Sequence, residues 1–282
     1  MVRGGQTAAD DGRDHEGRDP GATRPADGTP VAGAVDPALV DAVVFDMDGV
    51  VTRTARVHAA AWKRLFDDYL RERSRRDGMP FRPFDVETDY LPFVDGKPRQ
   101  DGVRDFLASR EVALPYGGPA DPPDADTVCG LGNRKNEYFL RAVAEHGAEA
   151  FPDAVRFVGR LHRHGIDTAI ISASDNVDQV LAAAGAASLF SATITGLDAG
   201  RLHLPGKPDP AVFLEAARRL GAQPARAVVV EDALAGVRAG RAGGFGLVIG
   251  VDRTRPESGH GADLAADGAD VVVRSLDEIA VD

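Results

Sequence analysis

Short, nearly continuous apolar runs recur along the chain between residues 42 and 273. Five of them are rich in β-branched residues, which is typical of strands buried on both faces of a parallel sheet. Stretches with helical periodicity lie between them, at residues 152–164, 176–184 and 210–220. The alternation predicts an α/β fold, with a doubly wound parallel sheet and a Rossmann-like core. The five predicted strands are residues 42–46, 168–172, 227–231, 247–251 and 270–273.

One region interrupts this alternation, directly after the first predicted strand. Residues 55–76 carry apolar side chains at every fourth position, and residues 136–146 also have a helical pattern. The segment between them is irregular and rich in proline. We therefore predict a helical cap domain inserted over the carboxyl ends of the strands. Open α/β sheets bind ligands at these ends, and the cap could act as a lid.

The chain begins with a segment of different composition. Residues 1–36 are rich in Gly, Asp, Arg, Pro and Ala and contain almost no large apolar side chain. Such a segment cannot bury enough apolar surface to fold, so we predict a disordered N-terminal extension. The predicted domains are then an α/β core formed by residues 37–53 and 149–282, and a helical cap formed by residues 54–148.

Charge and cysteine content exclude several kinds of partner. The formal net charge of −11 makes nucleic acid a poor partner, because phosphate backbones attract clusters of Lys and Arg. The single cysteine, Cys129, cannot form an intrachain disulfide, which fits a reducing compartment. No apolar run has the length of a membrane span or the character of a signal peptide. We expect a cytoplasmic monomer that binds neither nucleic acid nor membrane.

Acidic residues follow two of the predicted strands. Asp46 and Asp48 end the first one, where Gly49 allows a tight turn, and Glu231 and Asp232 end another. Each pair alone could be a solvated turn. Since the carboxyl ends of parallel strands meet at one edge, the two pairs can converge on one Mg²⁺, which prefers oxygen ligands. A cation there would remove the repulsion between the carboxylates and admit an anionic substrate.

Hydroxyl groups and a lysine extend this pattern. Ser172 and Ser174 follow a third strand, and Lys207 lies in a loop between prolines. Ser172 could instead cap the next helix, and Lys207 could be an ordinary surface lysine. The order of all four motifs along alternating strands favours a functional site. Together they form the set of groups needed for phosphoryl transfer through an aspartyl phosphate.

These motifs resemble those of the haloacid dehalogenase-like superfamily. Residues 45–50 (FDMDGV) resemble its first motif, residues 171–174 (ISAS) its second, Lys207 its third and residues 229–233 (VVEDA) its fourth. The resemblance extends from about residue 41 to the end of the chain.

The resemblance implies a role for each of these groups. Asp46 would be the nucleophile that becomes phosphorylated, and Asp48 would be the general acid/base and offer Mg²⁺ a backbone carbonyl. Glu231 and Asp232 would complete the protein ligands of the metal. The groups that would hold the transferring phosphoryl oxygens are Ser172 and Lys207.

Within the superfamily, the cap resembles that of the beta-phosphoglucomutase family, which interconverts beta-glucose 1-phosphate and glucose 6-phosphate. The similar segments are residues 95–99 (DGKPR) and 134–136 (RKN). The resemblance implies that His58 and Lys135 respond to cap closure and hold Asp48, and that Arg99 grips the second phosphate of the substrate. The further site residues that it implies are Thr54, Trp62, Gly96, Lys97, Ala173, Ser174 and Asn176.

Elementary chemistry supports part of this cap assignment. His58 and Trp62 are four residues apart and share a helix face, although each alone could be a core residue. The Arg99 guanidinium can bind a phosphate with two parallel hydrogen bonds. Departures from the family pattern are Asp175, where a lysine is frequent, Arg53, where an aspartate is common, and an extra Pro-rich loop around residues 116–126.

Two other functions use the same residues. A sugar-phosphate phosphatase would share the core and use water as the acceptor. A non-catalytic sugar-phosphate binder would not need all four acidic residues of the motifs, which are Asp46, Asp48, Glu231 and Asp232. The substrate class is a small sugar phosphate in every case.

Overall fold

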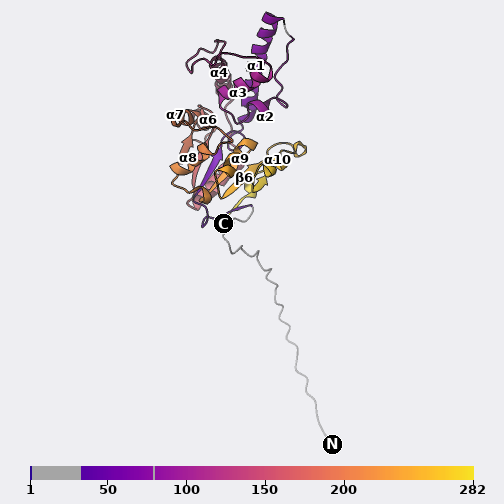
Figure 1. Cartoon of the computed structure of the whole chain (residues 1–282). Coiled ribbons are helices and arrows are strands. Elements are labelled where there is room, and N and C mark those ends of the chain that lie inside the picture. Colours follow the sequence, from indigo (N-terminus) through magenta and orange to yellow (C-terminus); the bar gives the residue numbers. More distant parts are fainter. Residues whose placement is uncertain (2–32, 79) are drawn as a thin grey trace.

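The core is a six-stranded sheet in which every strand runs parallel to its neighbours. The structure is a computed structural model that describes residue 1, residues 33–78 and residues 80–282 (Figure 1). The strand order β4-β3-β2-β5-β6-β7 confirms the predicted doubly wound α/β fold. The strands are β2 (Ala42–Asp46), β3 (Asp167–Ile171), β4 (Ala192–Ile194), β5 (Ala227–Glu231), β6 (Leu247–Val251) and β7 (Val271–Val273).

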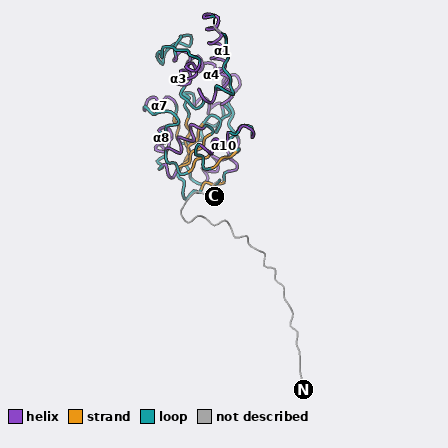
Figure 2. Tube along the Cα trace, turned by 45° about the vertical axis from the view of Figure 1, so that its right-hand side comes forward, coloured by secondary structure: helices purple, strands orange, loops and turns teal. Residues whose placement is uncertain are grey.

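Helices cover both faces of this sheet, as Figure 2 shows by the strands grouped between helices. Every residue of β2, β5 and β6 is buried, because alternate side chains pack into different apolar clusters. Val43 and Phe45 pack toward α5 (Pro152–Arg163) and α6 (Val177–Ala183), and Val44 packs toward the opposite cluster. That opposite cluster draws on α8 (Ala211–Arg219), α9 (Leu234–Ala242) and α10 (His260–Ala266). The remaining short elements are α7 (Gly196–Leu202), η1 (Pro224–Arg226), η2 (Pro256–Ser258) and η3 (Leu276–Glu278).

Three short strands were not predicted. β4 has only three residues, too few to produce a recognisable pattern. β1 (Ala34–Val35) pairs in parallel with β8 (Ala280–Val281), near the C-terminus. The prediction of a disordered segment is therefore wrong for residues 34–35, where Val35 joins the apolar core. Most of that segment, residues 2–32, lies outside the described part of the chain.

The cap is helical and has an apolar core of its own (Figure 1). The prediction of irregular structure between its two expected helices is wrong, because two helices, Tyr90–Phe93 and Arg99–Ser109, lie there. The second expected helix also begins earlier, at Val128, where the Thr127 side chain accepts a hydrogen bond from the Gly130 N–H. The cap helices are α1 (Ala55–Asp77), α2 (Tyr90–Phe93), α3 (Arg99–Ser109) and α4 (Val128–His146).

Two neighbouring linkers join the cap to the core. The Arg53 N–H donates to the Glu149 carbonyl, and the Phe151 N–H donates to the Val51 carbonyl, both at 2.8 Å. The Arg53 side chain also lies over the Phe151 ring at 4.5 Å. The linkers leave the core beside the end of β2, so the cap lies over the carboxyl edge of the sheet. No helix within the described ranges combines the length and the apolar character that crossing a bilayer requires.

Candidate active site

Three carboxylates meet at the carboxyl edge of the sheet. Asp46 ends β2, Glu231 ends β5, and Asp232 follows directly. The two strands are neighbours in register, and one oxygen from each of these side chains lies within 4.8 Å of the others. The structure thus brings together the two acidic pairs that the sequence places far apart.

Lys207 is the positive charge closest to this cluster. Its Nζ donates to Asp46 Oδ1 at 2.5 Å and to Glu231 Oε1, and its side chain is only 6% exposed. Burial would lower the pKa of Lys207, but these two carboxylates raise it above its usual value. Lys207 is therefore a fixed cation rather than a surface lysine.

One lysine does not balance three buried carboxylates. Burial raises the pKa of Asp46 well above its usual value despite Lys207, and burial together with Glu231 does the same for Asp232. A divalent cation would relieve this excess of negative charge. The donor set, carboxylate oxygens at the open edge of a sheet, fits Mg²⁺.

Two glycines make the acidic cluster possible. Gly49 has a φ of +91°, and a Cβ added there would lie 1.9 Å from Asp232 Oδ2. A Cβ added at Gly236, on α9, would lie 1.8 Å from Glu231 Oε1. The other Glu231 oxygen accepts the N–H groups of Asp232 and Ala233, both at 2.8 Å. Glu231 is thus fixed between a strand end and a helix that approaches closely.

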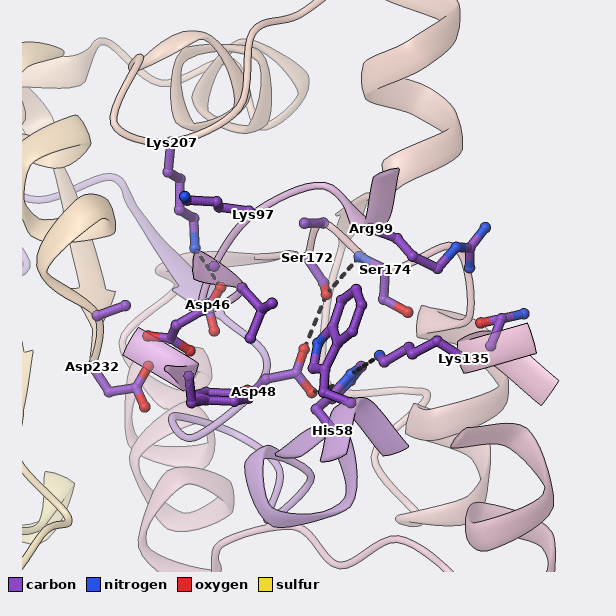
Figure 3. A pocket seen from close by; sticks show the side chains of 18 residues that line it. Asp46, Asp48, His58, Lys97, Arg99, Lys135, Ser172, Ser174, Lys207 and Asp232 are labelled. Atoms are coloured by element: carbon purple, nitrogen blue, oxygen red, sulfur yellow. Dashed lines mark hydrogen bonds and ion pairs between the residues drawn. The ribbon is translucent and has the colours of Figure 1, made fainter. Parts of the chain in front are cut away.

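Asp48 is held by groups from both the core and the cap. Thr54 Oγ1 donates to its Oδ1, and Ser172 Oγ donates to its Oδ2 at 3.2 Å. His58 Nε2 lies 3.3 Å from Oδ1. Burial alone would raise the pKa of Asp48, but His58 and the Thr54 hydroxyl lower it to about 2. Its two oxygens are thereby oriented by opposite walls of the pocket (Figure 3).

A lysine of the cap supports this histidine. Lys135 Nζ donates to His58 Nδ1 at 2.6 Å, although the two residues lie on different helices. The His58 ring stacks on Phe139, and the Lys135 Nζ lies 4.9 Å from the Trp62 ring. Burial lowers the pKa of Lys135 to about 7, and burial with Lys135 lowers that of His58. Since Lys135 donates to Nδ1, the proton of the His58 ring lies on Nε2, which faces Asp48 Oδ1.

These groups line one cavity of about 80 Å³ between core and cap (Figure 3). Lys97 reaches this cavity while its Nζ is bound to Asp105 at 2.8 Å. The predicted site residues that line it are Asp46, Asp48, His58, Trp62, Gly96, Lys97, Arg99, Lys135, Ser172, Ala173, Ser174, Lys207 and Asp232.

Three predicted site residues lie behind the cavity wall instead. Thr54 bonds to Asp48, Glu231 bonds to Lys207, and Asn176 donates to Asn136 Oδ1 at 2.6 Å. The Asn136–Asn176 hydrogen bond joins α4 of the cap to the start of α6 in the core.

Two of the three sequence departures have clear positions at the cap. Asp175 lines a cavity that adjoins the site, and its Oδ2 lies 3.1 Å from Arg99 Nη2. The extra Pro-rich loop packs on the start of α4, where Arg134 Nε donates to the Pro123 carbonyl. Arg134 is therefore turned toward this loop, whereas its neighbour Lys135 lines the pocket.

Sequence reasoning missed three cap residues that line the cavity, Tyr90, Val94 and Asp95. Burial, with Glu231 next in effect, raises the pKa of Asp95 to about 6. Asp95 opens the DGKPR segment, so that motif could have drawn attention to it. Tyr90 had no local signal, because it lies in the stretch predicted to be irregular.

Two core residues that support the site were also missed. Arg253 donates to the carbonyls of Gly49 and Val50, at 3.0 and 3.1 Å, and forms two hydrogen bonds with Asp153. His260 Nε2 donates to the Asp232 carbonyl at 2.7 Å. Both follow β6, and only the tertiary structure brings them beside the acidic motifs.

Comparisons with known proteins agree with this geometry. The sequence model of the haloacid dehalogenase-like hydrolase family matches residues 40–244. A beta-phosphoglucomutase of Mycobacterium tuberculosis is 46% identical over 86% of this chain and 92% of its own. The validoxylamine A 7'-phosphate phosphatase of Streptomyces hygroscopicus is 27% identical over 84% of this chain and 94% of its own. The solved beta-phosphoglucomutase of Clostridium difficile has a TM-score of 0.65 at 23% identity, covering 85% and 93% of the two chains.

The chain therefore belongs to the haloacid dehalogenase-like family of enzymes. Three of the four motifs that predicted this membership lie at the carboxyl ends of strands of the sheet. The remaining motif, Lys207, lies in a loop beside them. The narrower resemblance, to the beta-phosphoglucomutases, is confirmed as well.

Proposed function

We propose that the protein is a beta-phosphoglucomutase. It would interconvert beta-D-glucose 1-phosphate and glucose 6-phosphate through a phosphorylated Asp46 and a glucose bisphosphate intermediate. The Mycobacterium tuberculosis relative carries this name, and its similarity extends through the cap as well as the core.

In the proposed cycle, the chain's own residues handle both the phosphoryl group and the proton. Phosphorylated Asp46 transfers its phosphoryl group to a sugar hydroxyl, and Asp48 takes the hydroxyl proton. Lys207 stabilises the charge that develops on the phosphoryl oxygens, and Ser172 donates a hydrogen bond to them. After the bisphosphate has reversed its orientation, its other phosphoryl group returns to Asp46, and Asp48 returns the proton.

A magnesium ion fits the acidic cluster in this proposal. Its ligands would be the carboxylates of Asp46 and Asp232 and the backbone carbonyl of Asp48. The Glu231 carboxylate would add its negative charge to the same cluster. When bound, it would neutralise phosphate charge and bring donor and acceptor into line.

One observation carries the mutase proposal: the pocket has an anion-binding group at each end. Lys207 lies beside Asp46, and Arg99 of the cap lies on the opposite side of the pocket (Figure 3). A bisphosphate needs both ends at once. A cavity of about 80 Å³ is small beside the roughly 300–1,000 Å³ of typical ligand sites. The cap would therefore open to admit the sugar and close to exclude water from the aspartyl phosphate.

The direct test is to incubate the protein with Mg²⁺ and beta-glucose 1-phosphate, with and without glucose 1,6-bisphosphate. Glucose 6-phosphate and free phosphate are measured separately. We expect glucose 6-phosphate to dominate and its formation to depend on the bisphosphate primer. Release of free phosphate alone, with no effect of the primer, would contradict the mutase proposal.

The variant Arg99→Ala tests the second phosphate site. We expect mutase turnover to fall about 100-fold, because one end of the bisphosphate loses its positioning contact. Hydrolysis of p-nitrophenyl phosphate, which has a single phosphate, serves as the matched control and should change by less than about threefold. Equal losses in the two assays would show that Arg99 acts on the fold or on the phosphoryl step.

The second candidate is a sugar-phosphate phosphatase, and one observation favours it. Arg99 is not free to receive a phosphate, because Asp175 already pairs with it. A phosphatase needs one phosphate site, and a relative of this chain is named as a validoxylamine A 7'-phosphate phosphatase. The product analysis above separates the two candidates.

A further inference from the structure

The Arg99–Asp175 pair joins the two domains across the top of the pocket. Arg99 is the first residue of α3 in the cap, and Asp175 lies just before α6 in the core. Their side chains are 17% and 31% exposed, so the pair is partly shielded from water.

Asp175 uses only part of the guanidinium. The hydrogen bond comes from Nη2, and the buried Nε finds no acceptor among the residues that the structure describes. A donor buried without a partner is unfavourable. The guanidinium edge carrying Nε is therefore prepared for an anion other than Asp175.

We propose that Asp175 is a specificity-determining residue, an internal anion that competes with the second phosphate of the substrate for Arg99. The proposal rests on the mutase function proposed above, in which Arg99 grips that phosphate. In the free enzyme, the Asp175 carboxylate occupies the Arg99 guanidinium. When a bisphosphate binds, its non-reacting phosphate has to displace this carboxylate.

Electrostatics sets the direction of the effect. A phosphate that reaches Arg99 comes close to the Asp175 carboxylate, and like charges in a partly buried site repel strongly. The displaced side chain has space to move into, because a second cavity of 240 Å³ is also lined by Arg99 and Asp175. Competition at Arg99 thus weakens bisphosphate binding without blocking it. The intermediate is released from this end more readily, as its reorientation between the two transfers requires.

The alternative is that Asp175 only fastens the cap to the core. Removing its charge would then loosen the closed state and weaken the binding of every ligand enclosed there. The two roles predict opposite changes in bisphosphate affinity, and this makes the variant Asp175→Asn decisive.

Trp62 supplies the readout, because it is the only tryptophan of the chain and lines the pocket. Its fluorescence is titrated with glucose 1,6-bisphosphate in Mg²⁺. The compared proteins are Asp46→Asn alone, so that no phosphoryl group is transferred, and the same protein with Asp175→Asn or Asp178→Asn. Asp178 is an exposed acid on α6, so its variant matches the change in charge and length.

We expect Asp175→Asn to tighten bisphosphate binding about tenfold and Asp178→Asn to leave it unchanged. With Asp46 intact, Asp175→Asn should also lower the bisphosphate concentration that primes turnover. The rate of p-nitrophenyl phosphate hydrolysis should change less than the bisphosphate affinity, since this substrate has no second phosphate. Unchanged or weaker bisphosphate binding in Asp175→Asn would overturn the proposal, and so would equal tightening in both variants.

Failure of the proposed function would look different. A wild-type protein that releases only free phosphate would refute the mutase function while the titration still showed the competition at Arg99. A wild-type mutase whose Asp175→Asn variant binds the bisphosphate as before would refute only the role of Asp175.

Discussion

The core wall and the cap wall of the pocket are built in different ways. The core wall contains Asp46 and Lys207, with Glu231 directly behind them, and these three side chains are 11%, 6% and 0% exposed. Asp46 and Glu231 are the last residues of two adjacent hydrogen-bonded strands, so the register of the sheet determines their positions. The cap wall consists of His58, Lys135 and Arg99, which lie on three helices joined to the core by two linkers.

This difference separates the reaction from the choice of substrate. A group at the end of a buried strand cannot move without disturbing the sheet, so the phosphoryl chemistry has a fixed frame. The cap touches the core through polar pairs such as His58–Asp48 and Arg99–Asp175, which a small motion can break. Substitutions in the core wall should therefore abolish the reaction, whereas those in the cap wall should alter which substrates are turned over and under what conditions.

The largest effect is expected at Asp46, the proposed nucleophile. Asp46→Asn should lower p-nitrophenyl phosphate hydrolysis and mutase turnover alike, by about 10⁴-fold, because the proposed carrier of the phosphoryl group is removed. The matched control is Asp178→Asn on the surface, which should leave both rates unchanged. A substantial residual rate in Asp46→Asn would place the nucleophile elsewhere and end the distinction between the two walls.

A smaller effect is expected from Gly236→Ala. The added methyl group would overlap Glu231 Oε1, so the carboxylate or the helix has to shift. We expect a loss of about 1–3 kcal/mol in the free energy of unfolding, and a higher Mg²⁺ concentration for half-maximal activity. Denaturant unfolding measures the free energy of unfolding. A Mg²⁺ titration of p-nitrophenyl phosphate hydrolysis measures the Mg²⁺ concentration for half-maximal activity.

Gly200→Ala is the control for this substitution, because it lies on α7 with nothing within 4 Å of the added methyl group. It should stabilise the protein by up to about 1 kcal/mol through helix propensity. Similar behaviour of the two variants would mean that Glu231 is less tightly confined than the structure shows.

The smallest effect concerns the cap wall and depends on pH. Below its pKa of about 7, Lys135 is charged and donates to His58 Nδ1, which keeps the Nε2–H directed at Asp48. Deprotonation above this value removes the charge, so mutase kcat/KM should fall roughly fivefold as the pH rises through 7.

Two variants isolate this lysine. Lys135→Met should have a low and flat profile through that range, since no charge is left to titrate. Lys135→Arg should keep its charge and show no fall up to about pH 9. A fall near pH 7 that persists in the methionine variant would assign the titration to another group.

Sequence patterns predicted the core wall well because its information is local. Strands β2, β5 and β6 have the predicted bounds, since residues buried on both faces form continuous apolar runs. Asp46 and Glu231 end two of these runs, and parallel strands present their carboxyl ends at the same edge. The motifs and the topology together therefore implied the acidic cluster.

The cap was harder to predict, and its helices show why. The prolines between residues 80 and 98 suggested irregular structure, yet Pro98 directly precedes α3 and Arg99 begins it. Gly130 and Gly132 hid the first turns of α4, where the missing side chain of Gly130 makes room for the loop. In both places close packing against a distant segment outweighed local helix propensity.

The amino-acid sequence by itself determined the sheet, the order of the motifs and the chemical kinds of group at the strand ends, because these follow from periodicity and from chain direction. Only the tertiary structure decided which charges meet across the domain boundary. Asp175 against Arg99, and Arg253 against the loop after Asp46, join residues far apart in the chain. Their contacts arise from how the cap and the two edges of the sheet pack together, and no local pattern records that packing.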